Sequence, residues 1–312
     1  MHDLHRDAQE RWAAKRPLYT LEITGKDIAQ IKSAREGIRA GTPINIAFLG
    51  NETHQQRIEA ARIIRDCGFE PVPIISSRRI RSREDLDDLI AGLIRATHPR
   101  RFMFVGGDPA VPAGPYVDSL SLLGSGVLQR HAIRHVGIVG YPEGHPKIEN
   151  DRLWDALRWK IAFLKDAGCS IEITTQFGFD ASAIVDWIAK LRTFGIDVPV
   201  RVGVPGPADV GKLTRFARQF GVVTSAAVLR QYGLSLTNLL HRAGPERFAD
   251  RLIDGLEGRQ FGPVLFHLYP FGGILDSVRW MTGFLTQRHA AMDALTDGDI
   301  DGPPSIATPS IG

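Results

Sequence analysis

The sequence predicts an α/β protein built as a single (β/α)₈ TIM barrel. The 312-residue chain alternates short apolar runs with amphipathic stretches, which is typical of strands buried on both faces and covered by helices. Eight such runs, each followed by helical sequence, occupy about 270 residues, the usual size of this barrel. The rival is a doubly wound open sheet, which would carry a glycine-rich phosphate loop after its first strand. Residues 24–26 read Thr-Gly-Lys and form no such loop.

The expected strands are apolar runs of four to six residues. They are residues 19–23, 44–48, 72–75, 101–105, 135–140, 171–175, 198–203 and 264–268. The third run is weakened by Pro73, because proline has no N–H to donate to a strand ladder.

The stretches between these runs predict helices. They are residues 26–40, 53–67, 82–95, 151–167, 181–194, 207–220 and 273–285, with a further helical region at 225–256 that is broken at Gly233 and at Gly244-Pro245. Ser82 is the expected N-cap of its helix, with Asp85 three residues on. Gly68 stands where a helix commonly ends in a left-handed residue.

Composition excludes several classes of protein. The chain has 38 Lys and Arg against 35 Asp and Glu, a net charge of +3, so we expect no nucleic-acid partner. No apolar run is long enough to span a membrane, and residues 1–16 lack the apolar core of a signal peptide. Cys67 and Cys169 are too few for a disulfide framework. A reducing cytoplasm is the simplest setting, and no metal site is expected.

The domain boundaries follow from the same pattern. Residues 1–17 form a short lead, residues 18–290 form the barrel, and residues 291–312 form a tail expected to be disordered. The end of this tail is rich in Asp, Gly, Pro and Ser, a composition that builds no core.

A barrel places its active site at the carboxyl ends of the strands, and polar residues gather there. Glu22 lies within the first strand, either in a salt bridge to a neighbouring strand or as a general acid. Asp108 follows Gly106 and Gly107, and serves either as a turn cap or beside a flat ligand that the glycines let approach. Gln176 ends the sixth strand as a satisfied core amide or as a group that binds a heterocycle.

Two further segments lie at the same end. Tyr141-Pro142-Glu143-Gly144-His145-Pro146 follows the fifth strand, either as a rigid surface loop or as a cofactor-binding loop. Arg78, Arg79, Arg81 and Arg83 follow the third strand as a solvated basic face or as a phosphate contact.

Three of these motifs, each after a strand, resemble one known family. The family is the 5,10-methylenetetrahydrofolate reductases, and the resemblance covers residues 18–285. The motifs are Gly107-Asp108, the Tyr-Pro-Glu-Gly-His-Pro run and Thr175-Gln176-Phe177-Gly178-Phe179-Asp180. These are FAD-dependent barrels of one-carbon metabolism and methionine biosynthesis. The resemblance implies ping-pong hydride transfer from NADH or NADPH through FAD to methylenetetrahydrofolate, which gives 5-methyltetrahydrofolate.

The resemblance also implies roles for individual residues. Glu22 would be the acid that opens the imidazolidine ring, Asp108 would lie beside the flavin, and Gln176 and Tyr269 would bind folate. The implied FAD contacts are Gly107, Asp108, Tyr116, Tyr141, His145 and Lys165. A homo-oligomer is also implied.

The chain departs from the family at several positions. Gly106 replaces the usual arginine, Ile74 lies about where a histidine is common, and Phe48 replaces a threonine. Our hypothesis is that Arg78 or Arg79 takes the place of the missing arginine at the FAD pyrophosphate. The alternatives are a divergent relative that acts on another reduced pterin, one that runs oxidatively, and a folate- or flavin-binding protein without catalysis.

Overall fold

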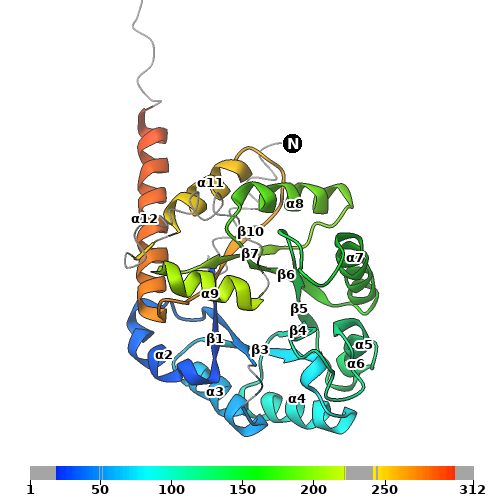
Figure 1. Ribbon diagram of the computed structural model, residues 1–312. Coiled ribbons are helices and arrows are strands. Elements are labelled where there is room, and N and C mark those ends of the chain that lie inside the picture. The colour runs from blue at the N-terminus through cyan, green and yellow to red at the C-terminus, as the bar shows by residue number, and fades with distance from the viewer. Residues whose placement is uncertain are drawn as a thin grey trace, which may run out of the picture.

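Eight parallel strands close into a barrel surrounded by helices (Figure 1). The computed structural model describes residues 19–48, 50, 52–220, 222, 242–243 and 245–298. The strand order around the barrel is β1-β10-β7-β6-β5-β4-β3-β2. The strands are β1 Tyr19–Thr24, β2 Pro43–Ala47, β3 Glu70–Ser76, β4 Phe102–Val105, β5 His135–Gly140, β6 Ser170–Phe177, β7 Val200–Pro205 and β10 Val264–Tyr269. The predicted (β/α)₈ barrel and its eight strands are confirmed.

The helices occupy the connections between the strands. They are η1 Gly25–Asp27, α2 Ile28–Ala34, η2 Arg35–Gly37, α3 His54–Asp66, η3 Ser77–Arg79, α4 Arg83–Thr97, α5 Ser119–Leu123, α6 Val127–Arg130, α7 Asn150–Asp166, α8 Ala181–Thr193, α9 Val210–Phe220, α11 Glu246–Leu256 and α12 Ile274–Gly298. Ser82 caps α4 by accepting a hydrogen bond from the backbone N–H of Asp85. Gly68 follows α3 with a φ of +88°, as predicted for a residue that ends a helix.

Several predicted elements differ from the structure. The helix expected at 26–40 is broken into η1, α2 and η2, and the short helices α5 and α6 between β4 and β5 were not predicted. The predicted tail began at residue 291, but α12 continues to Gly298, because residues 290–295 are mostly good helix formers. Residues 1–17, 223–241 and 299–312 lie outside the described residues, so the predicted lead, most of the broken helical region and the end of the tail lie outside them too.

Two apolar clusters make the core. The larger one packs the outer faces of the strands against the helices. The smaller one contains only strand residues, Val72, Ile74 and Met103, with Ala47, Val105 and Val139 packed against them. Because no helix contributes to it, this cluster fills the interior of the barrel, where inward side chains stack in layers.

Charged side chains occupy the amino-terminal end of the barrel interior. Arg101, just before β4, lies 3.0 Å from Glu70 of β3 and 3.0 Å from Glu172 of β6. Glu172 also lies 2.7 Å from Arg201 of β7, whose side chain is 1% exposed. The pKa of Arg101 is raised, since the two carboxylates outweigh the opposing effect of its burial. This network closes the end of the barrel opposite to the predicted site.

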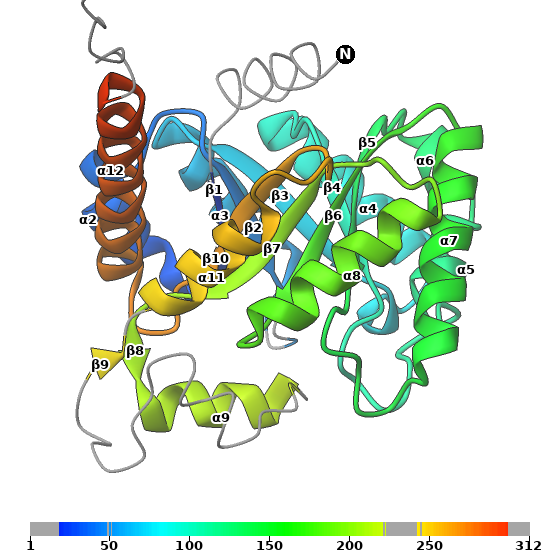
Figure 2. The same ribbon diagram turned by 90° about the horizontal axis from the view of Figure 1, so that it is seen from above.

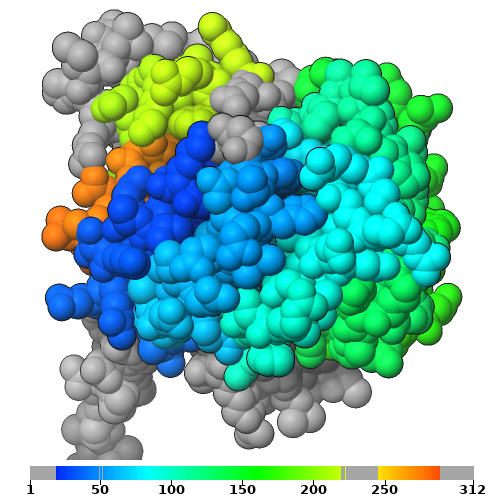
Figure 3. All heavy atoms as spheres, turned by 90° about the horizontal axis from the view of Figure 1, so that it is seen from below, coloured from blue at the N-terminus to red at the C-terminus, as the bar shows by residue number. Residues whose placement is uncertain are grey.

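The carboxyl end of the barrel is partly covered by α9. This helix lies beyond the ends of the strands, next to the two-stranded pair of β8 Ala208–Asp209 and β9 Arg242–Ala243 (Figure 2). Phe216 of α9 stacks on Phe271, just after β10, with ring centroids 4.3 Å apart. Figure 3 shows the side formed by the first half of the chain, with α9 in yellow-green at one end. None of the described helices has the length and apolar character needed to cross a membrane.

Candidate functional site

Glu22 lies at the open end of the barrel interior, where the strand pattern turns every second side chain inward. Its side chain is 21% exposed, and its Oε2 lies 3.4 Å from Nε2 of His267 on β10. His267 is completely buried, and its Nδ1 lies 2.6 Å from the hydroxyl of Thr20. The contact that Glu22 makes with a neighbouring strand is therefore one to an imidazole.

Tyr269 lies two residues beyond His267 and lines the same interior. Its ring meets the His267 ring edge-on at 4.9 Å, and its hydroxyl donates to the carbonyl of Thr175 at 3.2 Å. Burial raises the pKa of Tyr269 well above its usual range, and the nearby Glu22 and Tyr141 raise it further. This hydroxyl donates to the backbone and the ring lines the wall of the site, and the predicted substrate contact of Tyr269 stays a prediction.

Gln176 is placed by an irregularity at the end of β6. The register between β6 and β7 shifts between Thr174 and Phe177, and the Thr175 hydroxyl accepts a hydrogen bond from the N–H of Gly203 at 2.8 Å. The side-chain oxygen of Gln176 accepts from the N–H of Phe177 at 3.1 Å. Its amide nitrogen is therefore the end of this side chain that can donate to a ligand.

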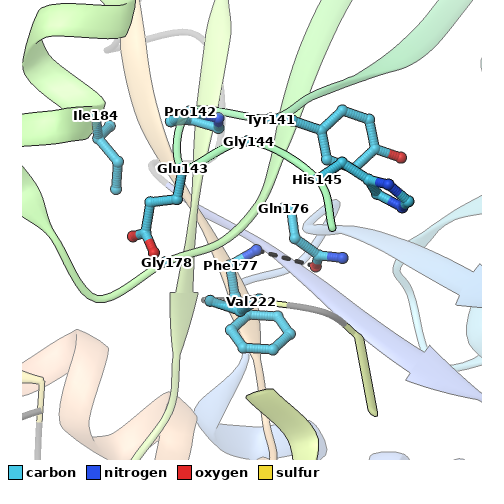
Figure 4. A pocket seen from close by; sticks show the side chains of 10 residues that line it. All are labelled: Tyr141, Pro142, Glu143, Gly144, His145, Gln176, Phe177, Gly178, Ile184 and Val222. Carbon is cyan, nitrogen blue, oxygen red and sulfur yellow. Dashed lines mark hydrogen bonds between the residues drawn. The ribbon is translucent and has the colours of Figure 1, made fainter. Parts of the chain in front are cut away.

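A small pocket lies between the loops that follow β5 and β6 (Figure 4). It is lined by Tyr141, Pro142, Glu143, Gly144, His145, Gln176, Phe177, Gly178, Ile184 and Val222. The rings of Tyr141 and His145 and the amide of Gln176 lie at one side of it, while the Glu143 carboxylate points away toward Gly178. Two segments that the sequence singled out separately therefore share one pocket.

Glu143 joins these two loops. Its Oε1 accepts hydrogen bonds from the backbone N–H of Phe179 at 2.7 Å and of Asp180 at 2.9 Å. Burial raises the pKa of Glu143 above its ordinary value of 4.5, and the nearby Asp180 also raises it, while the two N–H donors oppose the shift. Glu143 thus connects the loop after β5 to the loop after β6 through hydrogen bonds.

Tyr141 and His145 form an edge-on aromatic pair with ring centroids 5.4 Å apart. The N–H of Lys147 donates to Nδ1 of His145 at 3.2 Å. Burial lowers the pKa of His145, and the charge of Lys147 lowers it further, so the imidazole is neutral at neutral pH and its Nε2 is a donor. This pair offers an aromatic edge and neutral hydrogen-bonding groups to a ligand.

Asp108 lies at the rim, after β4. Gly107 has a φ of +93°, which glycine adopts without a steric penalty, and a Cβ there would lie 3.3 Å from Ser76. The Asp108 side chain is 74% exposed and its Oδ1 lies 2.5 Å from Nη2 of Arg79. Asp108 is therefore a paired rim carboxylate, and the backbone at Gly107 is the part open to a flat ligand.

Arg78 is bonded to the loop after β4. Its Nε donates to the carbonyl of Pro109 at 2.6 Å, and its two terminal nitrogens donate to the carbonyls of Val117 at 2.6 Å and Ala110 at 2.5 Å. Tyr116 of this loop is 5% exposed and belongs to the main core. Arg78 and Tyr116 thus fix the loop from inside.

Phe48 fills the space next to these arginines. The guanidinium of Arg79 lies 5.3 Å from the centroid of the Phe48 ring, and that of Arg57 lies 4.4 Å from it. Arg57 is 2% exposed and donates to the carbonyl of Ile74. Burial lowers the pKa of Arg57 to about 10. The Phe48 ring therefore packs between Arg57 and Arg79, at a position where the reductases that the sequence resembles carry a threonine.

Lys165 is not brought to the site. It is exposed in the last turn of α7, which leads into the start of β6 at the opposite end of the barrel. Arg78 and Arg79 are bonded within the protein. Lys165 therefore lies away from the predicted FAD face, where Gly107, Tyr141 and His145 do lie, and the FAD contacts of Arg78 and Arg79 stay a prediction.

Sequence reasoning missed His267 and the clamping role of Glu143. His267 is a lone polar residue in an apolar strand, the same signal that identified Glu22, so the sequence could have identified it. The partners of Glu143 are backbone groups 36 and 37 residues away, which no sequence pattern reveals. Within the described part of the chain, no group of three His, Cys, Asp or Glu side chains is arranged to hold a metal ion.

The chain is similar to known proteins in one segment of its sequence and in its fold. No family model matches the sequence. An 87-residue segment, 27% of this chain, is 31% identical to methylenetetrahydrofolate reductase 2 of Saccharomyces cerevisiae, and the match spans 13% of the yeast protein. A protein from Clostridium thermocellum, reported to bind two copies of 5-methyl-5,6,7,8-tetrahydrofolic acid, has the same fold. Its TM-score is 0.60 at 15% identity, over 89% of this chain and 96% of its own.

Proposed function

We propose that this protein is an oxidoreductase of reduced folates that converts 5,10-methylenetetrahydrofolate and NADH or NADPH to 5-methyltetrahydrofolate. The observation that carries the proposal is Glu22, a carboxyl group held by His267 at the open end of a barrel interior. Binding of a folate alone does not need an acid that opens the imidazolidine ring. The segment similar to the yeast reductase and the fold shared with a methyltetrahydrofolate-binding protein support the choice of substrate.

In the proposed reaction, Glu22 donates a proton to N10 of the substrate. The bond between N10 and the bridging carbon breaks, its electron pair stays on N10, and the bridging carbon becomes an iminium carbon bonded to N5. A hydride that originates from NADH or NADPH adds to this carbon and gives the N5-methyl group and the oxidised dinucleotide. Glu22 recovers a proton from water at the mouth, where its side chain is 21% exposed.

The other residues of the site orient the substrate. The amide nitrogen of Gln176 donates to the pterin, since the amide oxygen is held by the N–H of Phe177. The Tyr141–His145 pair provides an aromatic wall. Apolar side chains of β3 and β4 fill part of the barrel interior and exclude water there, and a low dielectric strengthens electrostatic contacts such as that of Glu22.

FAD stays a prediction as the carrier of the hydride. The arginines predicted for its pyrophosphate are bonded to Asp108 and to backbone carbonyls. No step of the proposed mechanism therefore depends on FAD.

The test is turnover by the purified full chain. The protein is mixed with methylenetetrahydrofolate and NADH or NADPH, with and without added FAD, and 5-methyltetrahydrofolate is measured by mass spectrometry. Formation of this product in step with dinucleotide oxidation supports the proposal. Tight binding of 5-methyltetrahydrofolate without turnover in either direction, in all four mixtures, would overturn it and favour a folate-binding protein.

A further inference from the structure

Three side chains form a line inside the barrel, from its buried centre to its open end. Thr20 and Glu22 are two residues apart on β1, so both point inward. Thr20 is the register partner of His267 on β10. The line runs from the Thr20 hydroxyl to Nδ1 of His267 over 2.6 Å, and from Nε2 of His267 to Oε2 of Glu22 over 3.4 Å.

The three groups can hydrogen-bond in one line, with Thr20 donating to Nδ1 of His267 and Nε2 of His267 donating to Glu22. In this arrangement Oε2 of Glu22 accepts the hydrogen bond, so the Nε2 that faces it carries a proton. Nδ1 is then an acceptor, and the Thr20 hydroxyl donates to it. A threonine hydroxyl at 2.6 Å from Nδ1 thus selects the imidazole tautomer that can hold Glu22.

The surroundings leave His267 with no competing partner. Within the described part of the chain, its two ring nitrogens have only these contacts. The groups packed around the line are Tyr269, whose hydroxyl donates to the Thr175 carbonyl, and Asn45, whose amide donates to the sulfur of Met103 at 3.3 Å. Neither carries a charge at neutral pH. His267 is completely buried, so it does not exchange protons directly with solvent.

We propose that Thr20 and His267 are positioning residues for Glu22. Thr20 fixes the tautomer of His267, and Nε2 of His267 holds Oε2 of Glu22. The other oxygen, Oε1, is then the one that carries the proton toward the substrate. This inference deepens the proposed function and rests on it for its kinetic part, whereas the proposed tautomer can be tested without turnover.

The matched variants are Thr20→Val, which keeps the shape and removes the hydroxyl, and Thr20→Ser, which keeps the hydroxyl. We expect Thr20→Val to lower kcat about 10- to 100-fold, with KM changed by less than about threefold, because the bonding of Glu22 and not the substrate contact is altered. Thr20→Ser should restore kcat to within about threefold of the unchanged protein. In a Glu22→Gln background, Thr20→Val should have no further effect.

The tautomer is measured independently by ¹⁵N NMR of the full-length protein labelled at histidine. In the unchanged protein and in Thr20→Ser, we expect His267 to be protonated at Nε2 and unprotonated at Nδ1. In Thr20→Val, we expect a mixture of the two tautomers. Protonation at Nδ1 in the unchanged protein, or full kcat in a folded Thr20→Val variant, would refute the proposal. If the unchanged protein turns over no folate, the proposed function fails while the NMR result still decides the tautomer.

Discussion

Nη2 of Arg79 lies 2.5 Å from Oδ1 of Asp108, across the loops that follow β3 and β4. The sequence assigned these residues to two different parts of one cofactor, the arginine to the pyrophosphate and the aspartate to the flavin. In the structure the two side chains pair with each other. The loop that carries Asp108 is further fixed by Arg78, so two adjacent arginines organise the rim of the site.

The first prediction concerns Arg78. Arg78→Ala removes three hydrogen bonds from a charged group to backbone carbonyls, each typically worth about 1.5–3 kcal/mol. We expect faster amide hydrogen exchange across residues 109–117 with little change elsewhere. Arg81→Ala is the control, because the Arg81 side chain is 75% exposed. Equal exchange in both variants would show that Arg78 does not hold the loop.

The second prediction concerns Arg79 and FAD. If Arg79 contacted the FAD pyrophosphate, Arg79→Ala would weaken binding by at least about tenfold, the equivalent of about 1.4 kcal/mol. Because this guanidinium is bonded to Asp108 and packed against Phe48, we expect less than a threefold change when FAD is titrated by fluorescence. A tenfold loss would restore the role predicted from the sequence.

The third prediction concerns Glu22. Glu22→Gln keeps the size of the side chain but removes the acidic proton, so we expect methylenetetrahydrofolate reduction to fall about 10²- to 10⁴-fold. Affinity for 5-methyltetrahydrofolate, measured by calorimetry, should change by less than about threefold. The exposed Glu36→Gln is the control. A parallel loss of binding and turnover would instead make Glu22 a binding residue.

The contrast between the strands and the site shows what the sequence could predict. The eight strands were predictable because each is a local apolar run, and Glu22 because a carboxyl group inside such a run is conspicuous. Lys165 was misplaced because a position carried over from a family ignores which end of the barrel the last turn of α7 reaches. The hydrogen-bond partners of Arg78 and Glu143 could not be predicted, because they are backbone groups more than 30 residues away in the sequence. Only the folded chain brings these groups together.

The fourth prediction is a pH dependence that arises from Glu143. Its pKa is raised in the folded protein above the ordinary 4.5 by burial, so the folded state binds this proton more tightly than the unfolded state. The resulting stability is fully present below the ordinary pKa and is lost as pH rises through the raised value. Glu143→Gln removes this titration and keeps an oxygen that accepts from Phe179 and Asp180.

Chemical denaturation at several pH values tests this prediction. We expect Glu143→Gln to gain stability relative to the unchanged protein as pH rises from acidic to neutral. Ser182→Ala, at an exposed residue of α8, is the control and should show no such trend. A Glu143→Gln curve parallel to that of the unchanged protein at every pH would mean that Glu143 titrates alike in both states.

The last prediction concerns the ion network at the amino-terminal end of the barrel. Glu172 lies 3.0 Å from Arg101 and 2.7 Å from Arg201, and Arg201 is 1% exposed. Removing one member leaves a buried charge without compensation, so Glu172→Gln should destabilise the fold by about 3–5 kcal/mol. Glu59→Gln is the matched control, since its pair with Arg62 is about half exposed, and it should cost less than about 1 kcal/mol.

The double variant Glu172→Gln/Arg201→Met should lose less stability than Glu172→Gln alone, because no unpaired guanidinium then remains at β7. Urea denaturation compares the four proteins, and equal losses for the buried and the exposed glutamate would show that the network does not stabilise the barrel.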